Sequence, residues 1–417
     1  HPALAYYVAS NESSEVSGTP ELLNKLDGTR GYQMQSECAG VHDGSPYKQV
    51  NPMQHYENTA SQRGSRVDGF NPEYGAPTLP TVEILREMMD EKDLWPINKE
   101  VWDYLDGNGF HLMSTMYTDL VNNYGKSSSI DEFAQKGQFV GAMNSKSIWE
   151  VWNYNKLDYG DRFCSGLLFW YHNCPVRQVC ARMWDWSLEP TASLYHTANS
   201  LEPLHAQFDY LKNTVSVVND FYQAFKAYTV TAQVYDINSK LVFEESAKVD
   251  LPSDGVANDV LTIRFPENIS QVHFIKLRLK DEKNKEVSSN FYWRSNDKYE
   301  GKETLTGPTS SGFEALSQLK QAKLKTSYRI RKTEDKYFVD VTIRNMSNSI
   351  AFFNQLQFLN PDLKPIRPSF YTDNFFSLMP GESKTVIIET DIRKIVENPV
   401  LVVKGWNVDR KQMDLKK

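Results

Sequence analysis

Two glutamates, Glu12 and Glu73, lie where acidic side chains can do chemistry. Glu12 closely follows the apolar run Ala3–Ala9, and Glu73 follows the strand-like run Val67–Phe70. In a parallel α/β barrel, the carboxyl ends of the strands form the active site. One carboxylic acid there can protonate a departing glycosidic oxygen, while a second carboxylate attacks the anomeric carbon or activates water. We interpret the two glutamates as a candidate pair of this kind; the alternative is two solvated loop acids.

Three further side chains have the chemistry to contact a sugar. Trp170 lies near the end of the apolar run Phe163–Tyr171, and its indole could form an apolar floor beneath a sugar ring. The alternative for Trp170 is packing in the core. Tyr74 follows Glu73 and is either a wall of the site or a structural residue. Asn173 comes just after the same apolar run and could donate hydrogen bonds to hydroxyl groups.

The sequence indicates neither a cofactor site nor a metal site. It contains no glycine-rich phosphate loop, and its four cysteines show no Cys-x-x-Cys spacing. Cys174 and Cys180 could form a disulfide, but buried free thiols are the favoured interpretation. We therefore expect no cofactor and no metal ligands.

The first half of the chain, residues 1–205, alternates apolar strand-like runs with helical patterns. This alternation is typical of a parallel α/β sheet or barrel. Candidate strands lie near residues 3–9, 31–36, 46–50, 67–71 and 163–171. Candidate helices cover Thr81–Met89, a long stretch from the capping box Ser129–Glu132 to about Tyr154, and Ser193–Leu204.

The second half changes to short β-rich runs divided by turn residues. Residues 206–297 have the strand spacing of one β-sandwich of about seven strands. The polar stretch Asn296–Gly312 contains several glycines and reads as a linker. A second β-rich block follows it, so that residues 298–417 are expected to hold the linker and a second sandwich.

Composition limits the possible partners. The 417 residues carry a net charge of -7, which argues against nucleic acid as a main partner. Apolar residues make up 40% and aromatic residues 12%, which supports packed cores rather than disorder. The sequence has no apolar run of about 18 residues, so no membrane-spanning helix is expected.

A series of motifs, in order along nearly the whole chain, resembles glycoside hydrolase family 2. The resemblance is to the carboxyl-terminal portion of its branch that includes mannosylglycoprotein endo-β-mannosidase and exo-β-D-glucosaminidase. It implies the carboxyl-terminal part of a (β/α)8 barrel, with strands four to eight, followed by two immunoglobulin-like β-sandwiches. The motifs are His1–Glu12, Leu26–Arg30, Gly44–Tyr47, Gly69–Pro80, Gly166–Trp170, Glu202–His205, Asn290–Trp293, Tyr371–Glu382 and Gly405–Asn407.

The resemblance assigns roles to individual residues. Glu12 matches the family's acid/base, Glu73 its nucleophile, and Asn11 the residue that hydrogen-bonds the substituent at the sugar's C2. It implies a retaining β-glycosidase that needs no cofactor and acts on β-mannosyl or β-glucosaminyl linkages in oligosaccharides or glycans. Retention in turn implies carboxyl groups about 5–5.5 Å apart. Glu73 would be ionised at rest, whereas Glu12 would have a raised pKa and hold its proton.

Barrel strands one to three have no counterpart in this sequence. We therefore expect the chain to pair with an amino-terminal portion of the same enzyme and to be inactive alone, because a half barrel exposes sheet edges. A secreted, periplasmic or vacuolar (lysosome-like) location suits an acidic, aromatic-rich glycosidase. The alternative from another functional class is a non-catalytic carbohydrate-binding or scaffold fragment.

Overall fold

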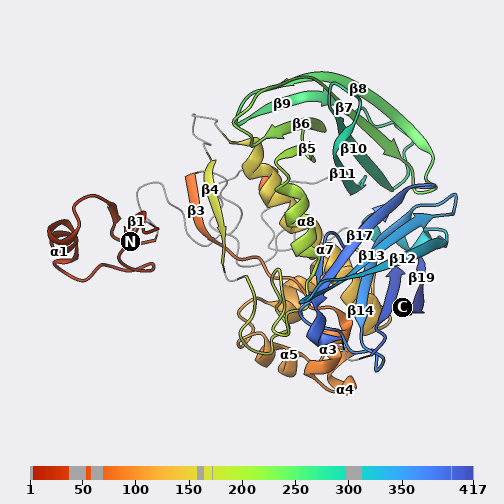
Figure 1. Ribbon diagram of the computed structural model, residues 1–417, viewed down its shortest axis with the longest axis horizontal. Helices are drawn as coiled ribbons and strands as arrows, with labels where there is room; N and C mark the ends of the chain where they lie inside the picture. The colour runs from red at the N-terminus through yellow and green to blue at the C-terminus, as the bar shows by residue number, and fades with distance from the viewer. Residues whose placement is uncertain are drawn as a thin grey trace.

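A computed structural model of the chain describes residues 3–36, 53–57, 69–156, 164–170, 172–296, 312–395 and 397–416. Figure 1 shows a region of helices and short strands that is flanked by two β-rich parts, one green and one blue. None of the helices in the described ranges is both long enough and apolar enough to cross a membrane. The expected strand at residues 46–50 and most of the expected linker lie outside these ranges.

The amino-terminal segment forms a small unit of its own. Strands β1 (Tyr6–Val8) and β2 (Gly31–Gln33) pair in parallel, and helix α1 (Thr19–Leu26) connects them. Figure 1 shows this unit apart from the rest of the molecule. About half of the surface of Tyr6 and of Val8 is exposed. The strand expected near residues 3–9 is thus present, but its faces are largely uncovered.

A second parallel pair lies against the body of the molecule. It consists of β3 (Gly69–Tyr74) and β4 (Cys164–Phe169). The parallel direction of both pairs agrees with the α/β expectation. The pairs remain two separate two-stranded sheets among the described residues, so a barrel sheet is not visible in this structure.

Helices surround the second pair. Helix α7 (Ile130–Tyr154) begins as expected, because the Ser129 hydroxyl accepts a hydrogen bond from the Glu132 backbone N–H at 3.3 Å. The Glu132 carboxylate bonds back to Ser128 rather than to Ser129. The other helices are α2 (Met53–Glu57), α3 (Val82–Met88), α4 (Glu91–Leu94), α5 (Lys99–Leu105), a π-helical turn at Met113–Tyr117, α6 (Thr118–Asn122) and α8 (Ala192–Ser200).

Helix α8 is shorter than the sequence predicts. It ends at Ser200, and β5 begins at Leu204. Pro203 explains the early end, because the residue before a proline avoids helical backbone angles. The chain thus passes directly from α8 into the first sandwich.

The first sandwich has seven antiparallel strands in two sheets, as the strand spacing predicts. The sheet orders are β5-β6-β9 and β11-β10-β7-β8. The strands are β5 (Leu204–Asp209), β6 (Thr214–Asn219), β7 (Phe225–Tyr235), β8 (Leu241–Leu251), β9 (Gly255–Thr262), β10 (Val272–Lys280) and β11 (Glu286–Ser295).

The second sandwich has two four-stranded sheets, β12-β13-β17-β15 and β16-β14-β18-β19. The chain crosses from one sheet to the other between β15 and β16, where it turns at Phe375, whose φ is 55°. A short 3-10 helix, Gly312–Gln318, precedes the sandwich. The strands are β12 (Leu324–Lys332), β13 (Lys336–Asn345), β14 (Ala351–Leu359), β15 (Phe370–Tyr371), β16 (Phe376–Leu378), β17 (Ser383–Asp391), β18 (Val400–Gly405) and β19 (Val408–Asp414).

A buried carboxylate joins α7 to the first sandwich. Glu150 of α7 is fully buried, and its Oε1 accepts hydrogen bonds from His205 of β5 at 2.9 Å and from Tyr292 of β11 at 2.8 Å. The amide of Asn290 also donates to this oxygen at 3.0 Å. Lys146, one turn earlier on α7, places its ammonium 3.5 Å away. Burial alone would raise the pKa of Glu150, but Lys146 and these donors hold it below its usual value.

We predict that Glu150→Gln lowers the free energy of unfolding by about 3–5 kcal/mol, because it leaves the buried Lys146 ammonium without its counter-ion. Urea unfolding of the two proteins measures the difference. Glu244→Gln, which removes an exposed carboxylate of β8, serves as the control and should stay within about 0.5 kcal/mol of the original protein. Equal losses in the two variants would contradict a role for Glu150 in joining α7 to the sandwich.

Candidate active site

Glu73 lies in a β-bulge at the end of β3. The partner of Asn71 on β4 is Leu167, and the partner of Tyr74 is Phe169. Pro72 and Glu73 therefore stand opposite the single residue Leu168. A bulge of this kind re-aims a side chain and ends strand pairing, and bulges are common beside active sites. Pro72 fits here because it has no N–H to give to the strand ladder.

Neighbouring side chains fix the backbone at Glu73. The buried side chain of Asn71 accepts a hydrogen bond from the Glu73 backbone N–H at 2.8 Å. Glu73 itself is half-buried. Tyr74 is fully buried, and its ring packs edge-on against Trp149 and Phe169. Burial raises the pKa of Tyr74 well above its usual value. These contacts favour the structural interpretation of Tyr74.

Trp170 packs directly onto the chain that leaves Glu73. Its backbone N–H donates to the Tyr74 carbonyl at 2.6 Å. A Cβ atom on Gly75 would lie 2.6 Å from Cε3 of the Trp170 indole, so only glycine allows this approach. The indole is half-buried, and the guanidinium carbon of Arg182 lies 5.5 Å from its centroid. The indole is thus held close to the Glu73 bulge.

Asn173 is exposed and comes shortly after β4 in the chain. It forms a β-bridge with Trp184, whose backbone N–H donates to the carbonyl of His172 at 3.3 Å. The Trp184 ring in turn meets Phe370 of the second sandwich edge-on at 5.7 Å. The second sandwich therefore touches the loop that carries Asn173.

Asn11 and Glu12 lie elsewhere in this structure. Both are exposed, and the Glu12 backbone N–H donates to the Ser36 hydroxyl at 3.0 Å. The φ angle of Glu12 is 48°, a left-handed conformation that is uncommon for a residue other than glycine. Figure 1 shows their unit separated from β3 and β4. The structure thus places Trp170 beside the chain at Tyr74 and Gly75, next to Glu73, while Asn11 and Glu12 lie in another unit (Figure 1). The catalytic pairing and the role of Asn173 stay predictions.

The sequence analysis overlooked a buried cluster behind Trp170. It consists of Asp106, His111, Cys180 and Arg182, which come from the α5–α6 region and from the loop after β4. The only sign of this cluster in the sequence is that Arg182 lies between Cys180 and Trp184. Three of these side chains are metal-ligating types, but the Arg182 guanidinium lies 2.8 Å from both His111 Nε2 and Cys180 Sγ. The guanidinium therefore occupies the His111 nitrogen and the Cys180 sulfur through which these residues would bind a metal ion.

The cysteines behave as the favoured interpretation predicts. Cys174 and Cys180 are buried free thiols, as is Cys164. The Cys174 thiol lies 2.9 Å from the backbone carbonyl of Cys180, to which it donates. Burial raises the pKa of the Cys174 thiol to about 12, so this sulfur stays protonated at neutral pH.

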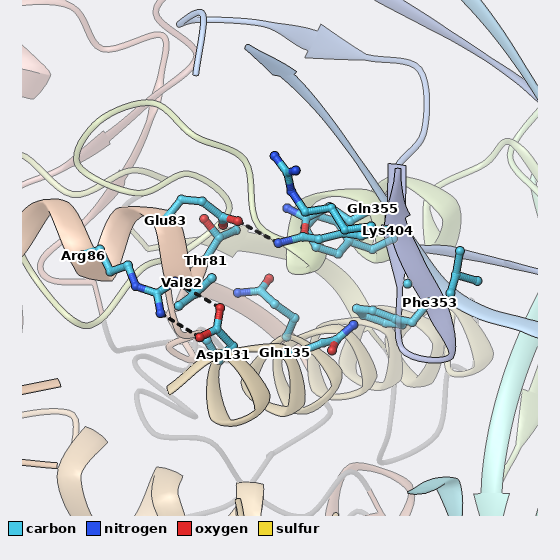
Figure 2. Close-up of a pocket in the computed structure, with 15 residues that line it drawn as sticks. Thr81, Val82, Glu83, Arg86, Asp131, Gln135, Phe353, Gln355 and Lys404 are labelled. Atoms are coloured by element: carbon cyan, nitrogen blue, oxygen red, sulfur yellow. Dashed lines mark hydrogen bonds and ion pairs between the residues drawn. The ribbon is translucent and has the colours of Figure 1, made fainter. Parts of the chain in front are cut away.

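A separate cavity of about 390 Å³ lies between α3, α7 and the second sandwich (Figure 2). Two ion pairs lie in its lining. Glu83 meets Lys404 of β18 at 2.7 Å, and Arg86 forms a two-pronged pair with Asp131 at 2.7 and 3.0 Å. The lining includes none of the predicted site residues, so we regard this cavity as part of a domain junction.

Comparison with known proteins matches both sandwiches to named families. Residues 212–299 match the Mannosidase Ig/CBM-like domain, and residues 304–408 match the exo-β-D-glucosaminidase Ig-fold domain. The expectation of two immunoglobulin-like domains is confirmed.

Relatives cover nearly the whole chain. An exo-β-D-glucosaminidase of Amycolatopsis orientalis is 24% identical over 89% of this chain and 37% of its own length. A mannosylglycoprotein endo-β-mannosidase of Lilium longiflorum is 21% identical over 94% of this chain and 47% of its own length. The chain resembles the glycoside hydrolases of family 2. The resemblance is to the branch that these two enzymes represent.

A solved structure has the same fold as this chain. The crystal structure of the exo-chitosanase CsxA of Amycolatopsis orientalis superposes with a TM-score of 0.90, at 22% identity, over 99% of this chain and 52% of that chain. The chain thus spans about half the length of that protein and less than half the length of the two sequence relatives.

We predict that Gly75→Ala lowers the free energy of unfolding by about 1–3 kcal/mol, because the added methyl group meets the Trp170 indole. The second change Trp170→Ala should restore most of this loss, since it removes the group that clashes. Gly166→Ala is the control, because its methyl group would meet the Phe70 ring instead, at 2.5 Å. If Trp170→Ala rescues both glycine variants equally, the specific contact between Gly75 and Trp170 is refuted. Urea unfolding of the original protein, the three single variants and the two double variants measures the six free energies of unfolding, and each double variant is compared with Trp170→Ala alone.

Proposed function

We propose that this chain carries the nucleophile of a retaining β-glycosidase that acts on β-mannosyl or β-glucosaminyl linkages in oligosaccharides or glycans. One observation carries the proposal: Glu73 stands on a bulge at the carboxyl end of a parallel strand, with the half-buried indole of Trp170 beside it. A carboxylate and an aromatic surface at the strand ends are what attack on a bound sugar ring requires.

In this mechanism Glu73 attacks the anomeric carbon while Glu12 gives its proton to the departing glycosidic oxygen. The product is a glycosyl-enzyme ester on Glu73. Water then attacks the same carbon, and Glu12 takes up the water's proton, which regenerates both carboxyl groups. Asn11 would hydrogen-bond the C2 substituent, where binding strengthens in the transition state. Trp170 would support the apolar face of the sugar, and Asn173 would donate to a hydroxyl group.

The mechanism requires Glu12 and Glu73 to face each other about 5–5.5 Å apart. We propose that the parallel pairs β1–β2 and β3–β4 are strands of one barrel, whose remaining strands come from an amino-terminal portion of the same enzyme. Two observations support this: both pairs run in parallel, and β1 leaves Tyr6 and Val8 half exposed for further packing. The left-handed backbone of Glu12 fits a site where strain is retained for function. The chain alone would then be inactive.

The nature of the linkage follows from the relatives. The two sequence relatives described above are an exo-β-D-glucosaminidase and an endo-β-mannosidase, so both linkages remain within the proposal. We also propose a secreted, periplasmic or vacuolar location, which suits an acidic, aromatic-rich glycosidase.

We predict that Glu73→Gln, made in the complete enzyme, lowers kcat/KM for an aryl β-mannoside or β-glucosaminide by about 10³-fold or more, because an amide cannot form the ester intermediate. Release of the aryl alcohol measures the rate. Glu91→Gln, an exposed carboxylate on α4, is the control and should leave the rate unchanged. A carbohydrate-binding fragment without catalysis would give no aryl release in the original protein and unchanged sugar binding in Glu73→Gln.

A further inference from the structure

Arg182 is a fully buried arginine in the loop after β4. Its guanidinium contacts three side chains among the described residues. One nitrogen lies 2.8 Å from His111 Nε2, a second donates to the Cys180 sulfur at 2.8 Å, and the carbon lies 5.5 Å from the centroid of the Trp170 indole. A buried guanidinium is costly unless its charge is compensated.

Among the described residues, His111 links the Arg182 guanidinium to a buried carboxylate. Asp106 is buried, and its carboxylate lies 2.7 Å from His111 Nδ1 while it also accepts the backbone N–H groups of His111 and Met113 at 3.1 Å. Because a guanidinium only donates, His111 Nε2 must accept, and the ring proton therefore sits on Nδ1 and points at Asp106. The row Asp106–His111–Arg182 thus links an anion to a cation through one neutral imidazole.

Every member of this row is fixed by the fold. The backbone N–H groups of His111 and Met113 hold the Asp106 carboxylate, so that the imidazole has one orientation. The loop that carries Arg182 is held to the chain after β3, since Thr78 and Ala181 bond to each other in both directions at 3.0 and 2.7 Å. The guanidinium is therefore held at a fixed position beside the indole.

We propose that Arg182 is a positioning residue for Trp170: through its contact with His111 it holds the indole against Gly75, in the place where the sugar ring binds. The expected effect on sugar binding rests on the proposed function, but the placement of the indole by Arg182 does not. Gly75 limits the indole on the side of the Glu73 bulge, and Arg182 contacts the ring through a cation–π interaction. With Arg182 changed, the indole gains freedom to tilt, and sugar binding loses its platform.

The first test is independent of activity. Tryptophan in the complete enzyme is replaced by 5-fluorotryptophan, and the Trp170 signal is identified by its loss in Trp170→Phe. We expect Arg182→Lys, which keeps the charge but lacks the planar fork, to shift or broaden this fluorine signal while most other tryptophan signals stay in place. Arg177→Lys is the matched control, because Arg177 contacts the Trp186 ring at 5.1 Å and should leave the Trp170 signal unchanged.

The second test uses hydrolysis of an aryl β-glycoside. Arg182→Lys should lower kcat/KM by about 10- to 100-fold, as small misplacements of binding groups do. In a Trp170→Ala background the same change should cost less than about twofold, because its target is already gone. Should Arg182→Lys unfold the protein, Arg182→Gln and His111→Gln replace it in the same cycle.

The outcomes are separable. An unmoved Trp170 signal in Arg182→Lys overturns the proposal, and so do equal losses of kcat/KM in the two backgrounds, which indicate a general structural role. A shifted Trp170 signal in a complete enzyme that hydrolyses no glycoside supports the positioning of the indole while it refutes the proposed function.

Discussion

Helix α7 is buried along almost its whole length, and the other parts of the body are packed around it. Phe139, near its middle, meets Tyr124, Trp293 of the first sandwich, and Phe352, Phe353 and Trp406 of the second sandwich. One apolar core therefore runs through the helical region and the first sandwich and reaches the edge of the second sandwich, whose interior forms a separate cluster. A helix enclosed in this way is stabilised by its partners rather than by its own propensity. In Figure 1, α7 and α8 stand between the two sandwiches.

The same helix supports the candidate site. Gly141 of α7 comes so close to the chain after β3 that a Cβ atom there would lie 1.9 Å from the Thr78 hydroxyl. Thr78 in turn bonds to Ala181, next to Arg182. The bulge with Glu73, the indole of Trp170 and the buried arginine thus belong to one rigid unit whose base is α7. The sandwiches contribute by enclosing α7, and the second one also by its contact with Trp184.

The features that could be predicted from the sequence are those that depend on neighbouring residues in the chain. The capping box at Ser129, the strands around Glu73 and Trp170, and the alternation in both sandwiches all have short-range causes. The Asp106–His111–Arg182 row escaped prediction, because its members meet only in the folded chain. Asn290–Trp293, quoted above as a family motif, forms a domain junction: Asn290 and Tyr292 contact Glu150, and Trp293 donates to Tyr124. The distance from Glu12 to Glu73 has no local cause either, because the two residues lie in separate two-stranded units of the described chain.

The identity of the nucleophile can be measured directly by trapping the glycosyl-enzyme. A 2,4-dinitrophenyl 2-deoxy-2-fluoro-β-mannoside forms this ester readily, because its leaving group is good, and the fluorine slows its breakdown by water. Peptide mass spectrometry of the complete enzyme after this treatment should find one added fluorosugar on the peptide that contains Glu73, and none in Glu73→Gln. A fluorosugar on another carboxylate, or no label on an enzyme that hydrolyses the parent mannoside, would contradict Glu73 as the nucleophile.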